Sequence, residues 1–483
     1  MSALAAALAA LVVLSAPAPR APAALRVRLD RAIAKARASA GLAHALVSVE
    51  VRALPGGRTL YARESDRSVA PASSLKLATT AAALDLYGPE TRFRTSVETG
   101  AADNSFGRLL GDVYLVGSGD PSLSRELEAR PETGVFEILA ESVHAAGVRR
   151  IEGRVIGVDG LFAGERRGAD WTWEDLVWWY GAEVSPLTFA DGSVHLKLTP
   201  GNTPGDPVVL ERHPASDYYR VDSTTITCRE PDTPGLTLSR PFGKNTIELS
   251  GCLAPGSAPV ERWVALEDPA RYATTVFAQA LRAKGIEVTG GVGMVATVPG
   301  GQRLLAAYDG APLAEILKDV NKPSHNLRAE MLLRLLGVRS RSEGTVEAGR
   351  DAVFTFLNAQ EVDTAGWDLY DGSGMSRSNL VTARGLAGLL VAMDKHRHAA
   401  VFRDSLPVAG VDGTLKRRLA GPNTRGRIQA KTGTLRHTSA LAGYAAPARG
   451  ERMAFAILVD HATAPVGEIQ DAIDGIAEAL LGR

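Results

Sequence analysis

A serine and a lysine three positions apart are the first residues of this sequence that could do chemistry together. They are Ser73 and Lys76, in the stretch Ser73-Ser74-Leu75-Lys76. Apolar residues at helical spacing follow, so we expect a helix to begin near Ser73 with both side chains on one face. A serine hydroxyl needs a neighbouring base to become a nucleophile, and a desolvated lysine can be that base. Taken alone, the pair more often marks an ordinary helix start.

Two more polar motifs occur far along the chain. One is the triplet Ser324-His325-Asn326, and the other is Lys431-Thr432-Gly433-Thr434, directly before an apolar strand-like run. The patterns S-x-x-K, S-x-N and K-T-G each occur once, in that order. Together they are the described signature of active-site serine enzymes that react with penicillin.

The elements that must position these motifs lie near both ends of the chain. Residues 44–54 alternate apolar and polar side chains, Gly56-Gly57 offers a turn, and residues 58–62 resume the pattern, which predicts a hairpin. Residues 439–445 and 453–459 have the composition of strands, and an amphipathic helix is predicted after Pro465. We expect these strands to share one sheet, with the terminal helices packed against it.

The middle of the chain has a different sequence pattern, with short strand-like runs and many residues that favour turns. We interpret residues 96–299 as an inserted region, with a second domain nested at about 163–262, and residues 24–95 with 300–483 as the main domain. A weak repeat relates residues 139–157 to residues 281–293, because both are predicted to form a helix, a glycine stop and a short strand.

The N-terminus and the cysteines suggest export. Residues 3–15 are uncharged and apolar, and an Ala/Pro-rich stretch follows, so residues 1–23 are predicted to be a signal peptide. The expected location is therefore periplasmic or extracellular. Cys228 and Cys252 are the only cysteines; a disulfide fits an oxidising compartment, and two buried free thiols remain the alternative.

Composition excludes several classes of protein. Lys+Arg and Asp+Glu both number 54, so the formal net charge is zero and nothing suggests nucleic acid as a partner. A hydrophobic content of 45% and a charged content of 22% are typical of globular proteins. No apolar run reaches the ~20 residues of a membrane span, so no integral membrane segment is expected.

With its three motifs, the chain resembles the low-molecular-mass class C penicillin-binding proteins, the D-alanyl-D-alanine carboxypeptidase/endopeptidase family. The resemblance covers most of the sequence after the expected signal peptide. About 250 residues separate Ser73 from Ser324, and the family carries large inserted domains at that place. Further stretches that resemble the family's landmarks are Pro71-Ala72-Ser73, Gly117-Ser118-Gly119-Asp120-Pro121-Ser122-Leu123, Asp371-Gly372-Ser373-Gly374-Met375-Ser376-Arg377, Leu406-Pro407-Val408-Ala409-Gly410 and Asp412-Gly413-Thr414-Leu415.

The resemblance implies an α+β fold of the penicillin-binding/β-lactamase type. A transpeptidase-like domain, with an antiparallel sheet and flanking helices, would carry two inserted, mainly β domains. Ser73 would be the acylated nucleophile and Lys76 its base. Ser324 would pass a proton to the leaving amine, and Asn326 would hold Lys76 and the substrate amide.

The other implied roles concern charge and the substrate carboxylate. Lys431 would keep Lys76 neutral, and Thr432 and Thr434 would bind the terminal carboxylate. The backbone N–H groups of Ser73 and Thr434 would form the oxyanion hole. The implied reaction cuts the peptide between two D-alanines of a peptidoglycan stem peptide, with β-lactams as covalent inhibitors and without a metal or cofactor.

The sequence departs from the family pattern at two places near the motifs. His325 stands where Asp is common, and Met375 stands where Leu is usual. Neither side chain holds an implied catalytic position, so we expect both differences to tune the site rather than abolish its activity.

A tryptophan-rich segment is a further candidate. Residues 171–180 hold four of the six tryptophans, together with Asp175. One interpretation is a contact between the inserted and main domains. The other is a pocket wall for the stem peptide, in which Asp175 binds an ammonium group and Arg377 a carboxylate, as at the free end of meso-diaminopimelic acid.

Rival functions stay open at this point. A β-lactamase needs fast deacylation, and the sequence lacks the E-x-x-L-N stretch that class A enzymes use for it. A catalytically inactive peptidoglycan-binding module is disfavoured because every required chemical group is present. A general serine esterase has little use for a K-T-G strand that selects a carboxylate.

Overall fold

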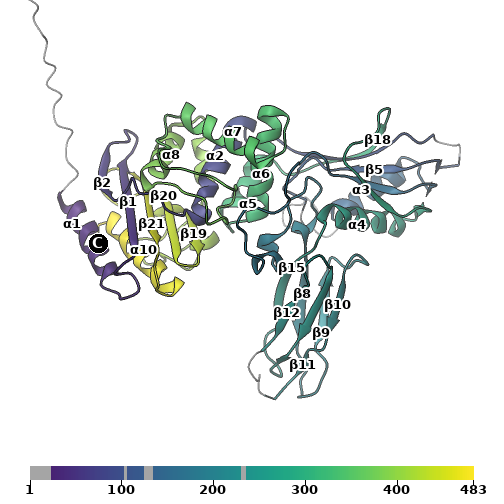
Figure 1. The fold of residues 1–483 in the computed structure, drawn as a ribbon, viewed down its shortest axis with the longest axis horizontal. Coiled ribbons are helices and arrows are strands. Elements are labelled where there is room, and N and C mark those ends of the chain that lie inside the picture. Colours follow the sequence, from purple (N-terminus) through teal and green to yellow (C-terminus); the bar gives the residue numbers. More distant parts are fainter. Residues whose placement is uncertain (1–22, 103–105, 124–133, 230–234, 483) are drawn as a thin grey trace, which may run out of the picture.

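The computed structural model describes residues 23–102, 106–123, 134–229 and 235–482. The expected signal peptide lies outside the described residues apart from Ala23, which begins helix α1 (Ala23–Arg37). The main domain lies at the left in Figure 1, and a first inserted domain extends from it to the right. A second inserted domain projects downward from the junction between these two domains. The fold is α+β, as expected.

The main domain is built around one antiparallel sheet that joins both ends of the chain. Its strand order is β19-β20-β21-β1-β2, and every neighbouring pair is antiparallel. The expected hairpin and the two expected C-terminal strands are therefore confirmed. The strands are β1 (Leu46–Ala53), β2 (Thr59–Arg63), β19 (Ile428–Leu435), β20 (Thr438–Ala445) and β21 (Met453–Asp460).

Helices cover both faces of this sheet. On one face, α1 and α10 (Val466–Leu480) share an apolar cluster with the strands. On the other face lie helices that come before and after the inserted region, in a second cluster. These helices are α2 (Lys76–Tyr87), α5 (Leu313–Asn321), α6 (Asn326–Arg341), α7 (Val346–Ala359), α8 (Ala383–Lys395) and α9 (Ala399–Asp404).

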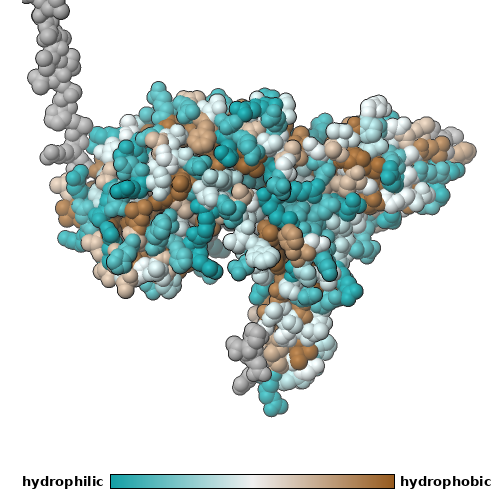
Figure 2. Space-filling model, viewed as in Figure 1, coloured by the Kyte–Doolittle hydropathy of each residue, from teal (hydrophilic) through white to brown (hydrophobic). Residues whose placement is uncertain are grey.

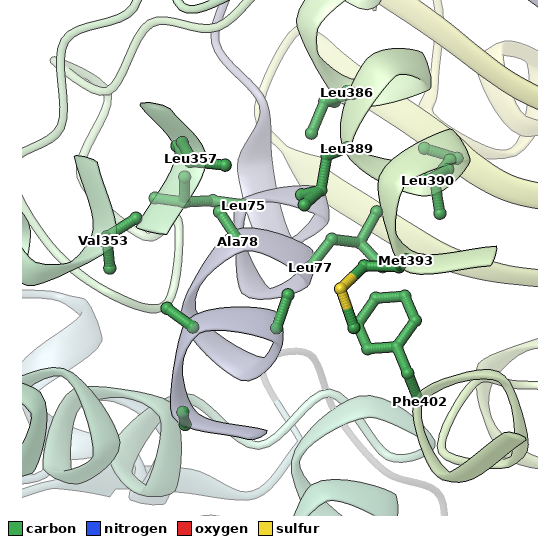
Figure 3. Packing of buried hydrophobic residues seen from close by; sticks show 14 of the residues in the cluster. Leu75, Leu77, Ala78, Val353, Leu357, Leu386, Leu389, Leu390, Met393 and Phe402 are labelled. Carbon is green, nitrogen blue, oxygen red and sulfur yellow. The ribbon is translucent and has the colours of Figure 1, made fainter. Parts of the chain in front are cut away.

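Helix α2 is the buried centre of the main domain. Residues 76–84 are all buried, and most of them are Ala, Leu or Thr, which let neighbouring helices approach closely. Figure 3 shows Leu75, Leu77 and Ala78 among apolar side chains of α7, α8 and α9. Gly88 ends the helix with a left-handed φ of 79°. The residues that follow Ser73 are thus held by packing from several sides.

The first inserted domain combines a five-stranded sheet, ordered β17-β7-β5-β3-β18, with a small sheet ordered β16-β6-β4 and two helices. Strand β3 begins at Arg94, and its partner β18 ends at Asp309. The sheet therefore extends beyond the limits of 96 and 299 that were expected for the inserted region. The elements are β3 (Arg94–Thr99), β4 (Arg108–Leu109), β5 (Val113–Val116), α3 (Val135–Ala145), β6 (Arg150–Ile151), β7 (Val155–Val158), α4 (Pro269–Ala283), β16 (Glu287–Val288), β17 (Val292–Val295) and β18 (Arg303–Asp309).

The weak internal repeat is confirmed in this domain. Each unit is a helix, a glycine with positive φ (Gly147 or Gly285) and two short strands. The equivalent strands of the two units pair with each other in parallel, β6 with β16 and β7 with β17. Two similar units therefore lie side by side around one core.

The second inserted domain is made of strands between Ser193 and Ala265. A disulfide joins Cys228 to Cys252, which settles the pairing that the sequence left open. Residues 163–192 lead into this domain through loops and short 3₁₀ turns. The strands are β8 (Ser193–Thr199), β9 (Val209–His213), β10 (Arg220–Ser223), β11 (Ile226–Thr227), β12 (Thr237–Ser239), β13 (Thr246–Ser250), β14 (Cys252–Leu253) and β15 (Val260–Ala265).

The surface agrees with the ordinary composition. Figure 2 shows one face of the molecule as mainly hydrophilic, with apolar residues in scattered groups. Within the described ranges, no helix combines the length and the apolar character that crossing a bilayer requires.

Candidate active site

Ser73 lies in a 3₁₀ turn, η1 (Ala72–Leu75), directly before α2. The α-helix itself begins at Lys76, three residues later than the spacing predicted. Ala72 has a left-handed φ of 45°, a conformation that costs energy for a residue with a side chain. This turn presents Ser73 partly exposed at the end of a buried helix.

The Lys76 Nζ atom has three polar neighbours. It lies 2.9 Å from Ser73 Oγ, 2.7 Å from Asn326 Oδ1 and 2.7 Å from the Ser373 carbonyl oxygen. The amide oxygen and the carbonyl oxygen can only accept hydrogen bonds, whereas the Ser73 hydroxyl can donate one. A neutral amine therefore gives its two N–H groups to Asn326 and Ser373 and turns its lone pair toward Ser73 Oγ.

Burial favours the neutral form of both Lys76 and Lys431. It lowers the pKa of Lys76 from 10.5 to about 7, against the opposing charges of Asp371 and Glu330. It also lowers the pKa of Lys431 well below its usual value, and repulsion from Lys76 adds to this effect. Desolvation is thus the main reason for a neutral Lys76, whereas the resemblance attributed this state to Lys431.

Ser324 and Lys431 form a second hydrogen-bonded pair. Lys431 Nζ donates to Ser324 Oγ at 2.8 Å and to the Thr432 carbonyl oxygen at 2.8 Å. Ser324 has a left-handed φ of 68° just before α6 begins at Asn326. Thr432 Oγ1 lies 2.8 Å from Thr414 Oγ1. Thr414 received no role from the sequence, although the stretch that contains it was noted as a landmark.

Strand β19 passes close to Ser73. A Cβ atom added at Gly433 would lie 2.7 Å from the Pro71 carbonyl oxygen and 3.0 Å from Ser73 N. Glycine is required at position 433 because any side chain would push the strand away from η1. The next residue, Thr434, is exposed. The structure therefore brings Ser73 N and the backbone around Thr434 close together.

A buried glutamate holds the loop that supplies the Ser373 carbonyl group. Glu330 accepts hydrogen bonds from the backbone N–H groups of Gly372 and Ser373, at 3.0 and 2.7 Å. Thr79 Oγ1 donates to the Gly372 carbonyl oxygen at 2.8 Å. Burial raises the pKa of Glu330 to about 7. These contacts could not be predicted from the sequence, because a backbone partner has no side-chain signal.

The tryptophan-rich segment contacts the main domain directly. Trp171 Nε1 donates to Asp371 Oδ2 at 3.1 Å. Asn326 Nδ2 donates to the Tyr180 carbonyl oxygen at 3.1 Å, which leaves Asn326 Oδ1 facing Lys76. The segment thus forms the contact between domains that one interpretation predicted, and this contact reaches an active-site residue.

The two departures from the family pattern lie in this contact. The ring of His325 is 4.9 Å from that of Trp179, and its Nε2 is 3.3 Å from Asp191 Oδ2. Met375 Sδ lies 3.3 Å from Asn326 Nδ2. Both residues therefore support neighbours of the motifs.

Asp175 and Arg377 contact different neighbours. Asp175 Oδ2 accepts a hydrogen bond from Thr172 Oγ1 at 2.6 Å. Burial and the nearby Asp175 raise the pKa of Tyr180 to about 12. Arg377 is exposed and donates to the carbonyl oxygen of Arg436, directly after β19. Their joint role in one pocket stays a prediction.

Comparison with known proteins identifies relatives over almost the whole chain. A D-alanyl-D-alanine carboxypeptidase from Actinomadura sp. (strain R39) is 37% identical over 431 residues, 86% of this chain and 78% of that protein. The crystal structure of penicillin binding protein 4 (dacB) from Haemophilus influenzae has a TM-score of 0.81 at 24% identity, covering 93% of this chain and 98% of that one. The same Haemophilus protein complexed with a β-lactam has a TM-score of 0.75 at 23% identity, covering 93% and 99%.

The model of the D-Ala-D-Ala carboxypeptidase 3 (S13) family matches residues 29–480. This match includes all three motifs and both inserted domains. The chain therefore belongs to the D-Ala-D-Ala carboxypeptidase 3 (S13) family, the low-molecular-mass class C penicillin-binding proteins.

Proposed function

We propose that this serine-type D-Ala-D-Ala carboxypeptidase cleaves peptidoglycan stem peptides through an acyl-enzyme on Ser73. One observation carries the proposal: Ser73 Oγ lies 2.9 Å from the Nζ atom of a buried Lys76 whose other two neighbours are hydrogen-bond acceptors. That arrangement turns the lone pair of a neutral amine toward the hydroxyl proton.

In the first step, Ser73 Oγ attacks the carbonyl carbon of the penultimate D-alanine while its proton passes to Lys76. The C–N bond then breaks, and the amine of the terminal D-alanine takes a proton through Ser324, whose hydroxyl is hydrogen-bonded to Lys431. Water attacks the Ser73 ester in the second step and restores the free hydroxyl. The products are D-alanine and a peptide shorter by one residue.

Two groups of contacts would hold the substrate. The N–H groups of Ser73 and Thr434 are proposed to stabilise the oxyanion, since the close approach of Gly433 brings β19 beside the nucleophile. The hydroxyl groups of Thr432 and Thr434 are proposed to bind the terminal carboxylate. Thr432 Oγ1 already pairs with Thr414 Oγ1, so Thr414 orients it.

For the third residue of the stem peptide, we propose recognition by Asp175 and Arg377. A carboxylate and a guanidinium suit the ammonium and carboxylate at the free end of diaminopimelic acid. Asp175→Ala and Arg377→Ala should each lower turnover of diaminopimelate-containing peptides relative to analogues with a neutral side chain. Equal losses on both kinds of peptide would contradict this pocket.

β-Lactams are proposed to acylate Ser73, because they present a strained amide to the same nucleophile. The β-lactam complex of the Haemophilus relative supports this extension. Export to the compartment that holds peptidoglycan is also proposed, from the apolar N-terminal sequence and from the disulfide between Cys228 and Cys252.

The test compares the parent protein with Ser73→Ala. Each is incubated with a fluorescent penicillin, and its intact mass is measured by mass spectrometry. D-Alanine release from a stem pentapeptide is measured in a separate assay. An adduct and D-alanine release only in the parent are expected. A folded parent with neither adduct nor release would contradict the proposal, and rapid loss of the adduct with hydrolysed penicillin would indicate a β-lactamase instead.

A further inference from the structure

Three rings form a row across one face of the second inserted domain. Strand β8 lies between β15 and β9, and the register places Trp263 opposite His195 and His195 opposite His213. The ring of Trp263 stacks on that of His195 at 4.4 Å and 15°, and the ring of His213 follows at 6.4 Å. We call these three residues the aromatic row.

A row of charged side chains lies next to the aromatic row on the same face. The register pairs Glu261 with Lys197 and Lys197 with Glu211. Lys197 Nζ lies 3.1 Å from Glu211 Oε1, and Glu261 Oε2 lies 3.3 Å from His195 Nε2. The face therefore offers one indole ring and two imidazole rings beside carboxylates and an ammonium group.

The opposite face of this sheet packs into an apolar core. The alternate residues Val194, Leu196 and Leu198 of β8 are fully buried in the core. Trp263, in contrast, keeps 42% of its surface exposed, and His213 is also exposed. A large aromatic side chain that stays open to solvent in an ordered row is typical of a binding surface.

Strand β15, which carries Trp263, contacts helix α6 of the main domain at its end. Ala265, two residues after Trp263 and on the same face, packs with Leu327 and Met331 of α6. Leu327 directly follows the active-site residue Asn326. Two residues of a strand span ~7 Å, so the row begins about that far from the contact with the main domain. Figure 1 shows β15 at the junction between the second inserted domain and the main domain.

We propose that the aromatic row binds the glycan strand of peptidoglycan, the polymer to which the stem peptide is attached. Pyranose rings present C–H faces that can stack on the exposed part of Trp263 and on the exposed ring of His213, while their hydroxyl and acetamido groups reach the charged row. A five-residue stem in extended form spans at most ~17 Å, so the sugar that carries a bound stem peptide must lie within about that distance of Ser73. The inference rests on the proposed function, because it places the remainder of the same substrate.

The experiment separates glycan binding from peptidase chemistry. Full-length protein is pelleted with insoluble peptidoglycan strands from which an amidase has removed the stem peptides. The same preparations are assayed for acylation by fluorescent penicillin and for D-alanine release from a free pentapeptide. The variants are Trp263→Ala, Trp263→Phe and His213→Ala, and the matched control is Phe106→Ala, which alters another exposed aromatic residue in the first inserted domain.

We expect the parent, the control and Trp263→Phe to pellet with the strands. Trp263→Ala should bind about tenfold more weakly, the effect of losing one stacked ring, and His213→Ala should also bind more weakly. Acylation and pentapeptide turnover should stay unchanged in all variants. Soluble N-acetylglucosamine oligomers should compete for the parent, whereas dextran, which has no acetamido groups, should not.

Several outcomes would overturn the inference. They are a parent that does not pellet with the peptide-free strands, equal binding of the parent, Trp263→Ala and His213→Ala, and failure of the oligomers to compete. If Trp263→Ala misfolds, His213→Ala and the competition experiment still decide the matter. Failure of the proposed function would look different, because the parent would then show no acylation whether or not it pelleted.

Discussion

The pH dependence of acylation tests the proposed role of Lys76 most directly. If the neutral amine accepts the Ser73 proton, the acylation rate follows the fraction of Lys76 that is deprotonated. Because burial lowers the pKa of Lys76 to about 7, the rate should rise about tenfold per pH unit below that value and level off above it. The acylation rate therefore increases as the pH is raised through the pKa of Lys76.

The expected magnitude comes from the same pKa. At pH 7, a lysine with the ordinary pKa of 10.5 is neutral in about one molecule in 3,000, whereas a lysine with a pKa of about 7 is neutral in about half. Burial thus increases the population of the base about a thousandfold, which corresponds to about 4 kcal/mol. Lys76→Arg should lose at least this factor, because arginine stays protonated at every pH used.

The assay is stopped-flow acylation by a chromogenic β-lactam between pH 5 and 9, with circular dichroism to show that the protein stays folded. Glu330→Gln is the matched control, since the charge of Glu330 raises the pKa of Lys76. Removing that charge should move the midpoint to lower pH. A flat profile, a midpoint near 10, or an active Lys76→Arg variant would refute the reasoning.

Three further predictions concern packing and stability. Gly433→Val should abolish acylation while the protein stays folded, because its side chain would displace β19 from the nucleophile; intact mass after penicillin treatment checks this, and an adduct would contradict it. Replacing both Cys228 and Cys252 by Ser should lower the free energy of unfolding by about 2–4 kcal/mol in urea titrations; unchanged stability would show that the disulfide contributes little. Arg328→Met removes the buried guanidinium that pairs with Asp191 of the inserted region and with Asp319 of α5, so it should destabilise the protein by about 3–5 kcal/mol; a loss below 1 kcal/mol would argue against a contribution from these buried pairs.

Much of the local structure could be predicted because short patterns carry it. The alternation around β1 and β2, the apolar run of α2 and the glycine that ends it all reflect interactions between near neighbours in the chain. The predicted start of α2 was wrong by three residues, since a 3₁₀ turn holds Ser73. No local pattern distinguishes that turn from the first turn of an α-helix.

Contacts between distant segments could not be predicted from the residues alone. Lys76 meets Asn326 across 250 positions of sequence, and the resemblance suggested that contact. The Ser373 and Tyr180 carbonyl groups have no sequence signal, because every residue carries one. Thr414 lay in a noted landmark, but its pairing with Thr432 depends on how a loop folds onto β19.

By itself, the sequence determined which chemical groups this protein can use, because S-x-x-K, S-x-N and K-T-G specify a nucleophile, a base and proton carriers by residue type. The tertiary structure alone decided how these groups behave. It buries Lys76 and so lowers its pKa, it brings β19 against η1, and it aligns Trp263, His195 and His213 across three strands. The physical reason is that desolvation and strand register depend on residues far apart in the chain, whereas a motif records only its own side chains.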